Sequence, residues 1–187
     1  MTGPGQLEQQ LAFLSDLRGL VRTMKALSAA SIRQYEQAVE ALVDYAETID
    51  RGLQVVLRSP PPERMGTGAG TNGVAAVVFG SDHGLCGRFN ESLIDHVVAR
   101  LDAMEPDPAR RRLLAIGARL VAGLEQTGQT VDSPVALPGS ADRITVAVQH
   151  ILPRLVAWQE SDPHRPVFLF HQSRASGQTL EPVMIRL

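Results

Sequence analysis

The segment GSDHGLCGRFN, from Gly80 to Asn90, places three glycines, a histidine, an aspartate and the chain's one cysteine between an apolar run and a helical pattern. A glycine-rich turn between a strand and a helix is where backbone N–H groups often bind phosphate. The segment lacks the spacing G-x-G-x-x-G, and it has no P-loop lysine. The residues therefore disfavour nucleotide binding and leave it as an alternative.

Cys86 and His83 raise a second possibility, a thiol nucleophile with an imidazole base near a helix N-terminus. Residues three apart in a turn need not face each other, and the pattern holds no third group to orient the base. The other histidines show no metal-ligand spacing. We therefore expect no catalytic residue, no metal site and no cofactor.

The same segment is better explained as turn chemistry. Asp82 predicts an Asx-type bond within the turn, the glycines allow backbone conformations that side chains forbid, and Asn90 can cap the following helix. The predicted structural loop comprises Gly80, Ser81, Asp82, Gly84, Leu85, Cys86, Gly87 and Asn90.

The bulk properties exclude several classes of protein. The chain has 187 residues, 44% of them apolar, and a net charge of −2, so its overall charge gives no reason to expect nucleic acid as a partner. One cysteine excludes an internal disulfide framework. The sequence shows no cleavable signal pattern and no apolar run of the roughly 20 residues that span a bilayer. We expect a cytosolic or peripheral protein.

The elements that position the loop begin with a long helix. From Gln6 to Arg58 there is no proline, glycine occurs only at Gly19 and Gly52, and good helix formers dominate. The alternative is a helix pair that folds back near Gly19. Apolar or small residues recur with the 4-3 spacing of a coiled coil, which requires a partner helix, at Tyr35, Val39, Leu42, Ala46, Ile49, Leu53 and Val56.

The sequence predicts residues 1–58 as a stalk helix, 59–72 as a linker rich in proline and glycine, and 73–187 as an α/β domain. Short apolar strands alternate with helices in the last part, which predicts a small doubly wound, mostly parallel (Rossmann-like) sheet with an antiparallel end. The predicted strands are 74–79, 113–116, 135–137, 167–170 and 182–187, and the predicted helices are 90–104, 118–126 and 141–159. A turn is expected near Ser176 and Gly177.

Two separated segments resemble the gamma subunit of F-type ATP synthases. GSDHGLCGRFNESL is similar to that family's segment [TS]-S-D-R-G-L-C-G-G-[LF]-N. LVRTMKALSAASIRQYEQAV is similar to its first helix, I-T-K-A-M-x-M-V-A-A-x-K-x-R-x-A-Q, and the matching positions are Met24, Lys25, Leu27, Ala29 and Arg33. The order of elements and the pair Glu181-Pro182 also fit the family, so the resemblance covers nearly the whole chain.

The resemblance implies a central rotor stalk that couples ion-driven rotation of the membrane c-ring to conformational change in the catalytic beta subunits. It implies a non-catalytic subunit whose partners are the alpha, beta and epsilon subunits and the c-ring. The location would be the cytoplasmic face of the bacterial inner membrane, with peripheral association through the complex. The α/β domain would be the foot, and the loop would be structural or interfacial.

The charges of the long helix divide it into a basic and an acidic stretch. Its first third is basic and the following stretch is acidic, at Glu36, Glu40, Asp44, Glu47 and Asp50. In the resembling family the basic segment meets acidic loops of the beta subunits, which favours a coupling role through complementary charge. The predicted partner contacts are Arg22, Met24, Lys25 and Arg33.

The sequence also departs from the family pattern. His83 stands where the family has arginine, Arg88 where it has glycine, and Ser31 where it has lysine. These departures favour the alternate F-type ATPases that occur beside standard ones in some bacteria. The family continues beyond Leu187 into a long C-terminal helix, which we expect this chain to lack and to obtain, where it needs it, from another chain.

Two alternatives from other classes stay open. The first is an α/β ligand-binding or enzyme domain with a dimerising helical arm. The second is a gamma-like assembly or inhibitory protein that occupies the rotor position without turning.

Overall fold

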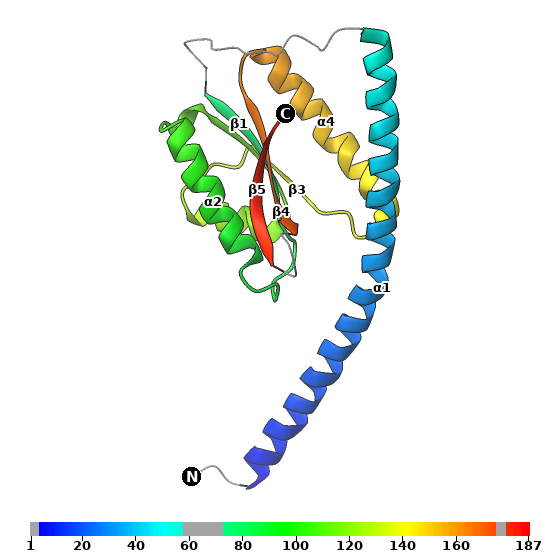
Figure 1. The fold of residues 1–187 in the computed structure, drawn as a ribbon. Helices are drawn as coiled ribbons and strands as arrows, with labels where there is room; N and C mark the ends of the chain where they lie inside the picture. Colours follow the sequence, from blue (N-terminus) through cyan, green and yellow to red (C-terminus); the bar gives the residue numbers. More distant parts are fainter. Residues whose placement is uncertain (1–3, 58–72, 175–178) are drawn as a thin grey trace. The chain divides into compact units, whose positions relative to one another are not determined.

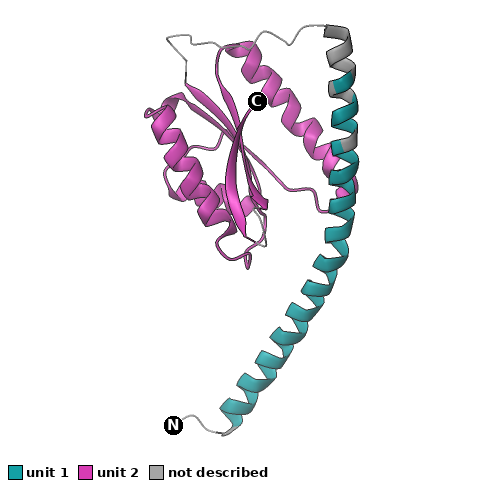
Figure 2. Ribbon diagram, viewed as in Figure 1, with its two compact units in different colours: residues 1–64 teal, residues 65–187 magenta. Residues whose placement is uncertain are grey.

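The computed structural model describes residues 4–57, 73–174 and 179–187 (Figure 1). Contacts divide the chain into two compact units, Met1–Arg64 and Met65–Leu187 (Figure 2). The predicted linker, residues 59–72, lies outside the described residues, and so does the predicted turn at Ser176 and Gly177.

The first unit consists of helix α1, which runs without interruption from Pro4 to Leu57. Its 54 residues correspond to about 81 Å of helix. Proline suits the first helical position because its missing N–H would have no partner there. The alternative of a helix pair folding back near Gly19 is wrong, because one glycine lowers helix propensity without forcing a turn.

The second unit is built on a five-stranded sheet with the order β3-β2-β1-β4-β5. The first four strands are parallel, and β5 pairs antiparallel with β4. This confirms the predicted mostly parallel α/β fold with an antiparallel end. The strands are β1 Val74–Phe79, β2 Arg111–Ile116, β3 Ser133–Val135, β4 Val167–Arg174 and β5 Leu180–Arg186.

Three helices cover the sheet, with α2 and α3 on one face and α4 on the other (Figure 1). They are α2 Phe89–Met104, α3 Ala118–Gln126 and α4 Ile144–Ser161, and short 3₁₀ turns η1 and η2 span Pro108–Arg110 and Ala141–Arg143. None of the helices in the described part of the chain combines the length and apolar character needed to cross a membrane.

Several predicted boundaries need correction. The strands predicted at 113–116, 167–170 and 182–187 are β2 Arg111–Ile116, β4 Val167–Arg174 and β5 Leu180–Arg186. The helix predicted from residue 141 begins as α4 at Ile144, because residues 141–143 form the turn η2. The strand predicted at 135–137 is β3, which ends at Val135. The backbone N–H of Leu137 donates to the Asp82 carboxylate instead of to a neighbouring strand, so pairing stops before it.

The core lies on both faces of β1, as its continuous apolar run predicts. Ala76 and Val78 pack with Leu93, Leu101 and Phe170 beneath α2 and α3. Ala75 and Val77 pack with Leu114, Ile151 and Trp158 beneath α4.

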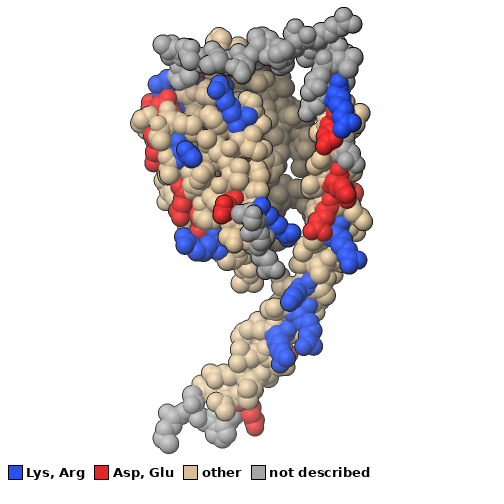
Figure 3. Space-filling view, in the orientation of Figure 1, with Lys and Arg blue, Asp and Glu red and all other residues tan. Residues whose placement is uncertain are grey.

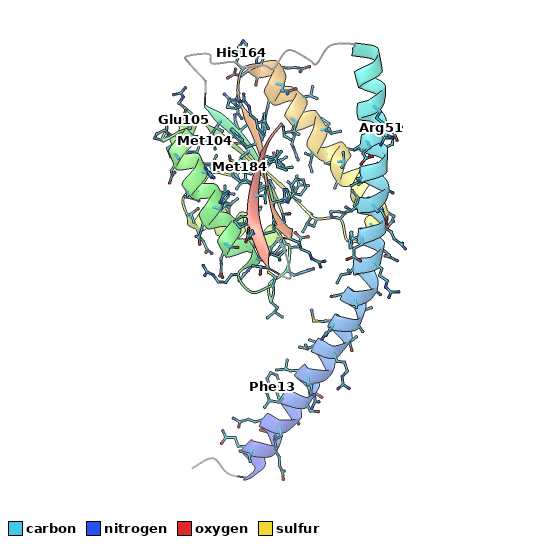
Figure 4. The ribbon with its side chains drawn as sticks, viewed as in Figure 1. Phe13, Arg51, Met104, Glu105, His164 and Met184 are labelled. Carbon is cyan, nitrogen blue, oxygen red and sulfur yellow. The ribbon has the colours of Figure 1, made fainter. Side chains whose placement is uncertain are left out.

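A buried arginine organises the connection from α2 to β2. The Arg111 side chain is 2% exposed, and its Nη2 lies 2.7 Å from Asp102 Oδ1. Its Nε donates to the Glu105 carbonyl at 2.8 Å, and its Nη1 donates to Gln129 Oε1 at 3.1 Å. Glu105 lies at the end of α2 beside Met104 (Figure 4). Because burying a charge is costly unless it is paired and hydrogen-bonded, this set of partners is what permits an arginine here.

Candidate functional site

The loop between β1 and α2 is closed at its base by Ser81 and Asn90. Asn90 Oδ1 accepts from the Ser81 N–H at 3.0 Å, and Asn90 Nδ2 donates to Ser81 Oγ at 2.7 Å. Ser81 Oγ in turn donates to the His83 carbonyl at 2.9 Å. The prediction that Asn90 caps α2 is wrong, because Asn90 lies inside the helix and the N-cap position is Arg88, without a side-chain cap.

Asp82 bonds outside its own turn. Its Oδ1 accepts from the Ala118 N–H at 2.7 Å, and its Oδ2 accepts from the Leu137 N–H at 3.2 Å. The expected Asx-type bond within the turn is therefore wrong. The carboxylate instead joins the loop to the start of α3 and to the segment after β3, both at the carboxyl edge of the sheet.

The start of α3 needs a cap from elsewhere because its own N-cap residue is a glycine. Gly117 has φ +112°, and a Cβ at that position would lie 2.8 Å from the Ser81 backbone N and O atoms. A residue with a capping side chain therefore does not fit there. Asp82 supplies the acceptor that Gly117 lacks, and a carboxylate is also favoured at a helix N-terminus.

The tip of the loop, residues 83–88, is exposed throughout. Leu85 is 95% exposed and has φ +64°, a conformation that non-glycine residues seldom adopt. Cys86 Sγ lies 3.6 Å from the backbone carbonyl of His83, which is the histidine contact that the structure gives it. A nucleophile needs an imidazole base rather than a carbonyl, so this contact does not support the cysteine–histidine alternative.

The loop leads to the point where strand order reverses, between β1 and β4. In doubly wound sheets ligands bind in the crevice outside the carboxyl ends of such a strand pair. Here Gln172, which extends past the end of β1, donates from Nε2 to the Phe89 carbonyl and to Ser92 Oγ, both at 2.8 Å. A ligand at that point would have to displace both hydrogen bonds.

Among the described residues, no group of three His, Cys, Asp or Glu side chains is arranged to hold a metal ion. The loop carries one imidazole, one thiol and one carboxylate, and the carboxylate accepts two backbone hydrogen bonds. The Asp82 carboxylate therefore fixes the backbone of the loop, which is a structural role.

Helix α1 carries the predicted partner contacts on exposed positions. Arg22, Lys25 and Arg33 are exposed, and Met24 is 49% exposed. Figure 3 shows Lys and Arg gathered along one stretch of α1, with Asp and Glu on the stretch that follows towards its C-terminal end. The four residues project from one helix and are spread over three of its turns.

Apolar side chains of α1 are exposed along the described part of the helix. Phe13, which projects from the first third of α1 (Figure 4), is 62% exposed, and Leu27 is 66% exposed. Of the predicted coiled-coil positions, Val39 and Leu42 are 59% and 56% exposed and Tyr35 is half-buried. The positions 49, 53 and 56 lie outside the described side chains.

Three residues near the loop, Gln172, Gly117 and Leu137, could not be assigned to it from the sequence alone. Gln172 lies 80 residues or more from its partners, Leu137 lies 55 residues from Asp82, and Gly117 precedes Ala118, which lies 36 residues from Asp82. A glycine before a helix could have marked Gly117 as a special backbone position, but the identity of the cap depends on the fold.

Residues 5–187 match a family model described as ATP synthase. The ATP synthase gamma chain of Parvibaculum lavamentivorans is 27% identical over 119 residues, which cover 60% of this chain and 40% of the relative. The ATP synthase gamma chain of Methylibium petroleiphilum is 22% identical over 192 residues, covering 100% of this chain and 65% of the relative. The chain thus spans roughly two fifths to two thirds of the length of these curated relatives.

Solved structures share the fold. The rotor of Euglena gracilis mitochondrial ATP synthase superposes with a TM-score of 0.57 and 10% identity, covering 99% of this chain and 63% of that one. The central stalk and c-ring structure of Tetrahymena thermophila mitochondrial ATP synthase gives a TM-score of 0.54 and 15% identity, covering 87% and 70%. At these identities the likeness concerns the fold.

Proposed function

The chain belongs to the ATP synthase gamma family, and from that premise we propose that it acts as the central rotor stalk of an F-type ATP synthase. In this role it couples ion-driven rotation of a membrane c-ring to conformational changes in catalytic beta subunits. It contributes no catalytic group of its own. Its place is peripheral, at the cytoplasmic face of a bacterial inner membrane.

One observation carries the proposal: a single family match over residues 5–187 joins a 54-residue exposed helix to an α/β unit. Soluble monomers rarely leave large apolar patches exposed, so a helix with exposed Leu and Phe along its length suits a subunit enclosed by partners. The partners proposed are the alpha and beta subunits around α1, and the epsilon subunit and the c-ring at the α/β unit.

The basic stretch of α1 supplies the proposed coupling contact. Arg22, Lys25 and Arg33 present positive charge on exposed positions, and Met24 adds an apolar contact between them. Complementary charge on the beta subunits would set the register and speed of encounter. The loop from Gly80 to Asn90 is proposed as a rigid interface at the carboxyl edge of the sheet.

Co-expression with the alpha and beta subunits of the same organism tests the proposal. Co-purification with ATP hydrolysis that depends on this chain is the expected result. Hydrolysis that falls as the chain is added would instead favour an inhibitory or assembly protein. A discrete soluble dimer that binds neither subunit would overturn the stalk proposal and favour an α/β domain with a dimerising arm.

Charge reversal on α1 sharpens the test. Arg22→Glu should weaken association about tenfold at low salt, because it places like charge against an acidic partner. Glu40→Arg, on the acidic stretch of the same helix, is the matched control and should bind as the unaltered chain does. The difference should shrink in high salt, since exposed charges are screened.

A further inference from the structure

An apolar stripe runs along α1 on both sides of Ser31. At about 100° per residue, its side chains point within about 40° of one direction on a regular helix. Before Ser31 the stripe consists of Leu17, Leu20, Met24 and Leu27. After Ser31 it consists of Tyr35, Ala38, Leu42 and Tyr45, two of which, Tyr35 and Leu42, are also predicted coiled-coil positions. Six of these eight side chains are exposed and two are half-buried, so apolar surface lies open over about 42 Å of helix.

The stripe is symmetric about Ser31. Its members lie four, seven, eleven and fourteen residues before Ser31 and at the same four intervals after it. Two antiparallel copies of α1 related by a two-fold axis at Ser31 would therefore bring their stripes together. Leu20 of each copy would then lie at the level of Leu42 of the other.

A break in the stripe limits which helix can cover it. Steps of three and four residues alternate within each half, but two steps of four meet at Ser31 and interrupt the heptad. A partner helix with uninterrupted heptads would follow the stripe on one side of Ser31 and diverge from it on the other. A second antiparallel copy carries the same break at the same level. Ser31 suits this position because its side chain is small and its Oγ already donates to the Leu27 carbonyl at 3.1 Å.

The charges of α1 favour an antiparallel over a parallel pair. Arg18, Arg22 and Glu40 point more than about 120° away from the stripe, so their charges remain in water when the stripe is covered. Antiparallel copies place the basic stretch of each along the acidic stretch of the other, with Arg22 at the level of Glu40. Parallel copies would place like charges side by side, which is less favourable.

We infer that the free chain forms a homodimer in which two α1 helices pair antiparallel along the stripe, with Ser31 at the two-fold axis. The inference goes beyond the proposed function, because it concerns the chain outside an ATP synthase. A second copy of the chain covers the apolar surface that the alpha and beta subunits cover in the proposed complex.

Cysteine cross-linking of the full chain tests the geometry. In a Cys86→Ser background, Ser31→Cys should give a covalent dimer with a short bismaleimide, because a residue meets its own copy only at the two-fold axis. Leu20→Cys alone should give none, whereas a mixture of Leu20→Cys and Leu42→Cys chains should. Self-cross-linking of Leu20→Cys as efficient as that of Ser31→Cys would show parallel pairing and overturn the inference. Absence of a cross-link in all three samples would also overturn it.

Sedimentation equilibrium measures the strength of the dimer. Leu20→Glu should weaken dimerisation at least about tenfold, since it places a charge in the apolar contact twice. Leu11→Glu is the matched control, because Leu11 and Leu20 are both 60% exposed but Leu11 points about 160° away from the stripe. Equal weakening by both variants, or a monomer at every soluble concentration of the unaltered chain, would refute the dimer. Dilution below the dissociation constant returns the monomer, in which Leu27 is 66% exposed.

Addition of alpha and beta subunits separates the dimer from the proposed function. Loss of the Ser31→Cys cross-link as the chain enters the complex would support both. A cross-linkable dimer that binds neither subunit would support the dimer and overturn the stalk proposal. A chain that assembles with both subunits but never cross-links on its own would overturn the dimer and leave the stalk proposal standing.

Discussion

Helix α1 and the α/β unit differ most in what surrounds their apolar side chains. Leu14 and Leu27 of α1 are 59% and 66% exposed, whereas Leu101 and Phe170 of the α/β unit are fully buried. Both units are rich in the same residue types, so composition does not explain the contrast. The core side chains of the α/β unit are buried within that unit, whereas the large apolar side chains of the described part of α1 are mostly exposed, as the proposed stalk role would require.

The largest effect should come from the core of the α/β unit. Phe170→Ala removes a fully buried ring and should lower the free energy of unfolding by about 3–5 kcal/mol. Urea unfolding followed by fluorescence of Trp158, the chain's one tryptophan, measures this unit alone. Leu27→Ala in α1 is the comparison, followed by the helical circular dichroism of the chain, and should change stability by less than about 0.5 kcal/mol. A loss at Leu27 as large as that at Phe170 would end the contrast.

Replacing an arginine should cost more stability in the α/β unit than in α1, because Arg111 is buried and Arg51 is exposed. Arg111→Met strips Gln129 and two backbone carbonyls of a donor and should cost about 2 kcal/mol. Arg51→Met in α1 breaks a 2.9 Å pair with Glu47 in which both side chains are largely exposed, and should cost less than about 0.5 kcal/mol. Urea unfolding at matched salt measures Arg111→Met, and helical circular dichroism measures Arg51→Met. Equal costs would contradict the proposed difference.

Replacing glycine with alanine should lower the stability of the α/β unit at Gly117 and raise that of α1 at Gly19. Gly117→Ala forces a side chain onto a positive φ and against the Ser81 backbone, so it should destabilise the α/β unit by at least about 1 kcal/mol. Gly19→Ala meets nothing within 4 Å and should stabilise α1 by about 0.5–1 kcal/mol. Thermal melting by far-ultraviolet circular dichroism records both. A stabilising Gly117→Ala would show that the close approach to Ser81 relaxes.

The smallest effect should be a pH dependence confined to the α/β unit. Burial, with the nearby Arg100 charge, lowers the pKa of His96 below 6.5, and its Nε2 is buried without a hydrogen-bond partner among the described residues. As the pH falls, the His96 imidazole is therefore protonated at a higher pH in the unfolded chain than in the folded one. The contribution of neutral His96 to the free energy of unfolding is complete above pH 6.5 and declines as the pH falls below it. His96→Gln should flatten the decline in urea midpoints measured by Trp158 fluorescence. An unchanged slope would refute the assignment.

Local patterns were sufficient for the type and order of the elements. The proline-free run before residue 58 predicted one long helix, and the apolar run of β1 predicted a strand buried on both faces. Boundaries failed where a distant group intervened. Strand β3 ends at Val135 because the Leu137 N–H donates to the Asp82 carboxylate. The β propensity of the local residues does not predict this long-range contact.

The candidate loop was found from the sequence, but its bonding was not. Glycines and an aspartate between strand and helix marked a turn, and the family resemblance marked its residues. The predicted hydrogen-bond partners of Asp82 and Asn90 were wrong, because both were assigned to local turn and cap positions. In the folded sheet Asp82 instead accepts from the Ala118 and Leu137 N–H groups, and Asn90 accepts from the Ser81 N–H. Gln172 was missed because its hydrogen bonds exist only once β4 lies beside β1.

The sequence by itself determined the long helix, the α/β order, the charge division of α1 and the family, since each depends on neighbouring residues or on motifs read in order. Only the tertiary structure decided which side chains close the loop, that Asp82 caps α3 and that Arg111 is buried with its partners. The physical reason is that a hydrogen bond needs its donor and acceptor within about 3 Å. For residues tens of positions apart, only the packed sheet sets that distance.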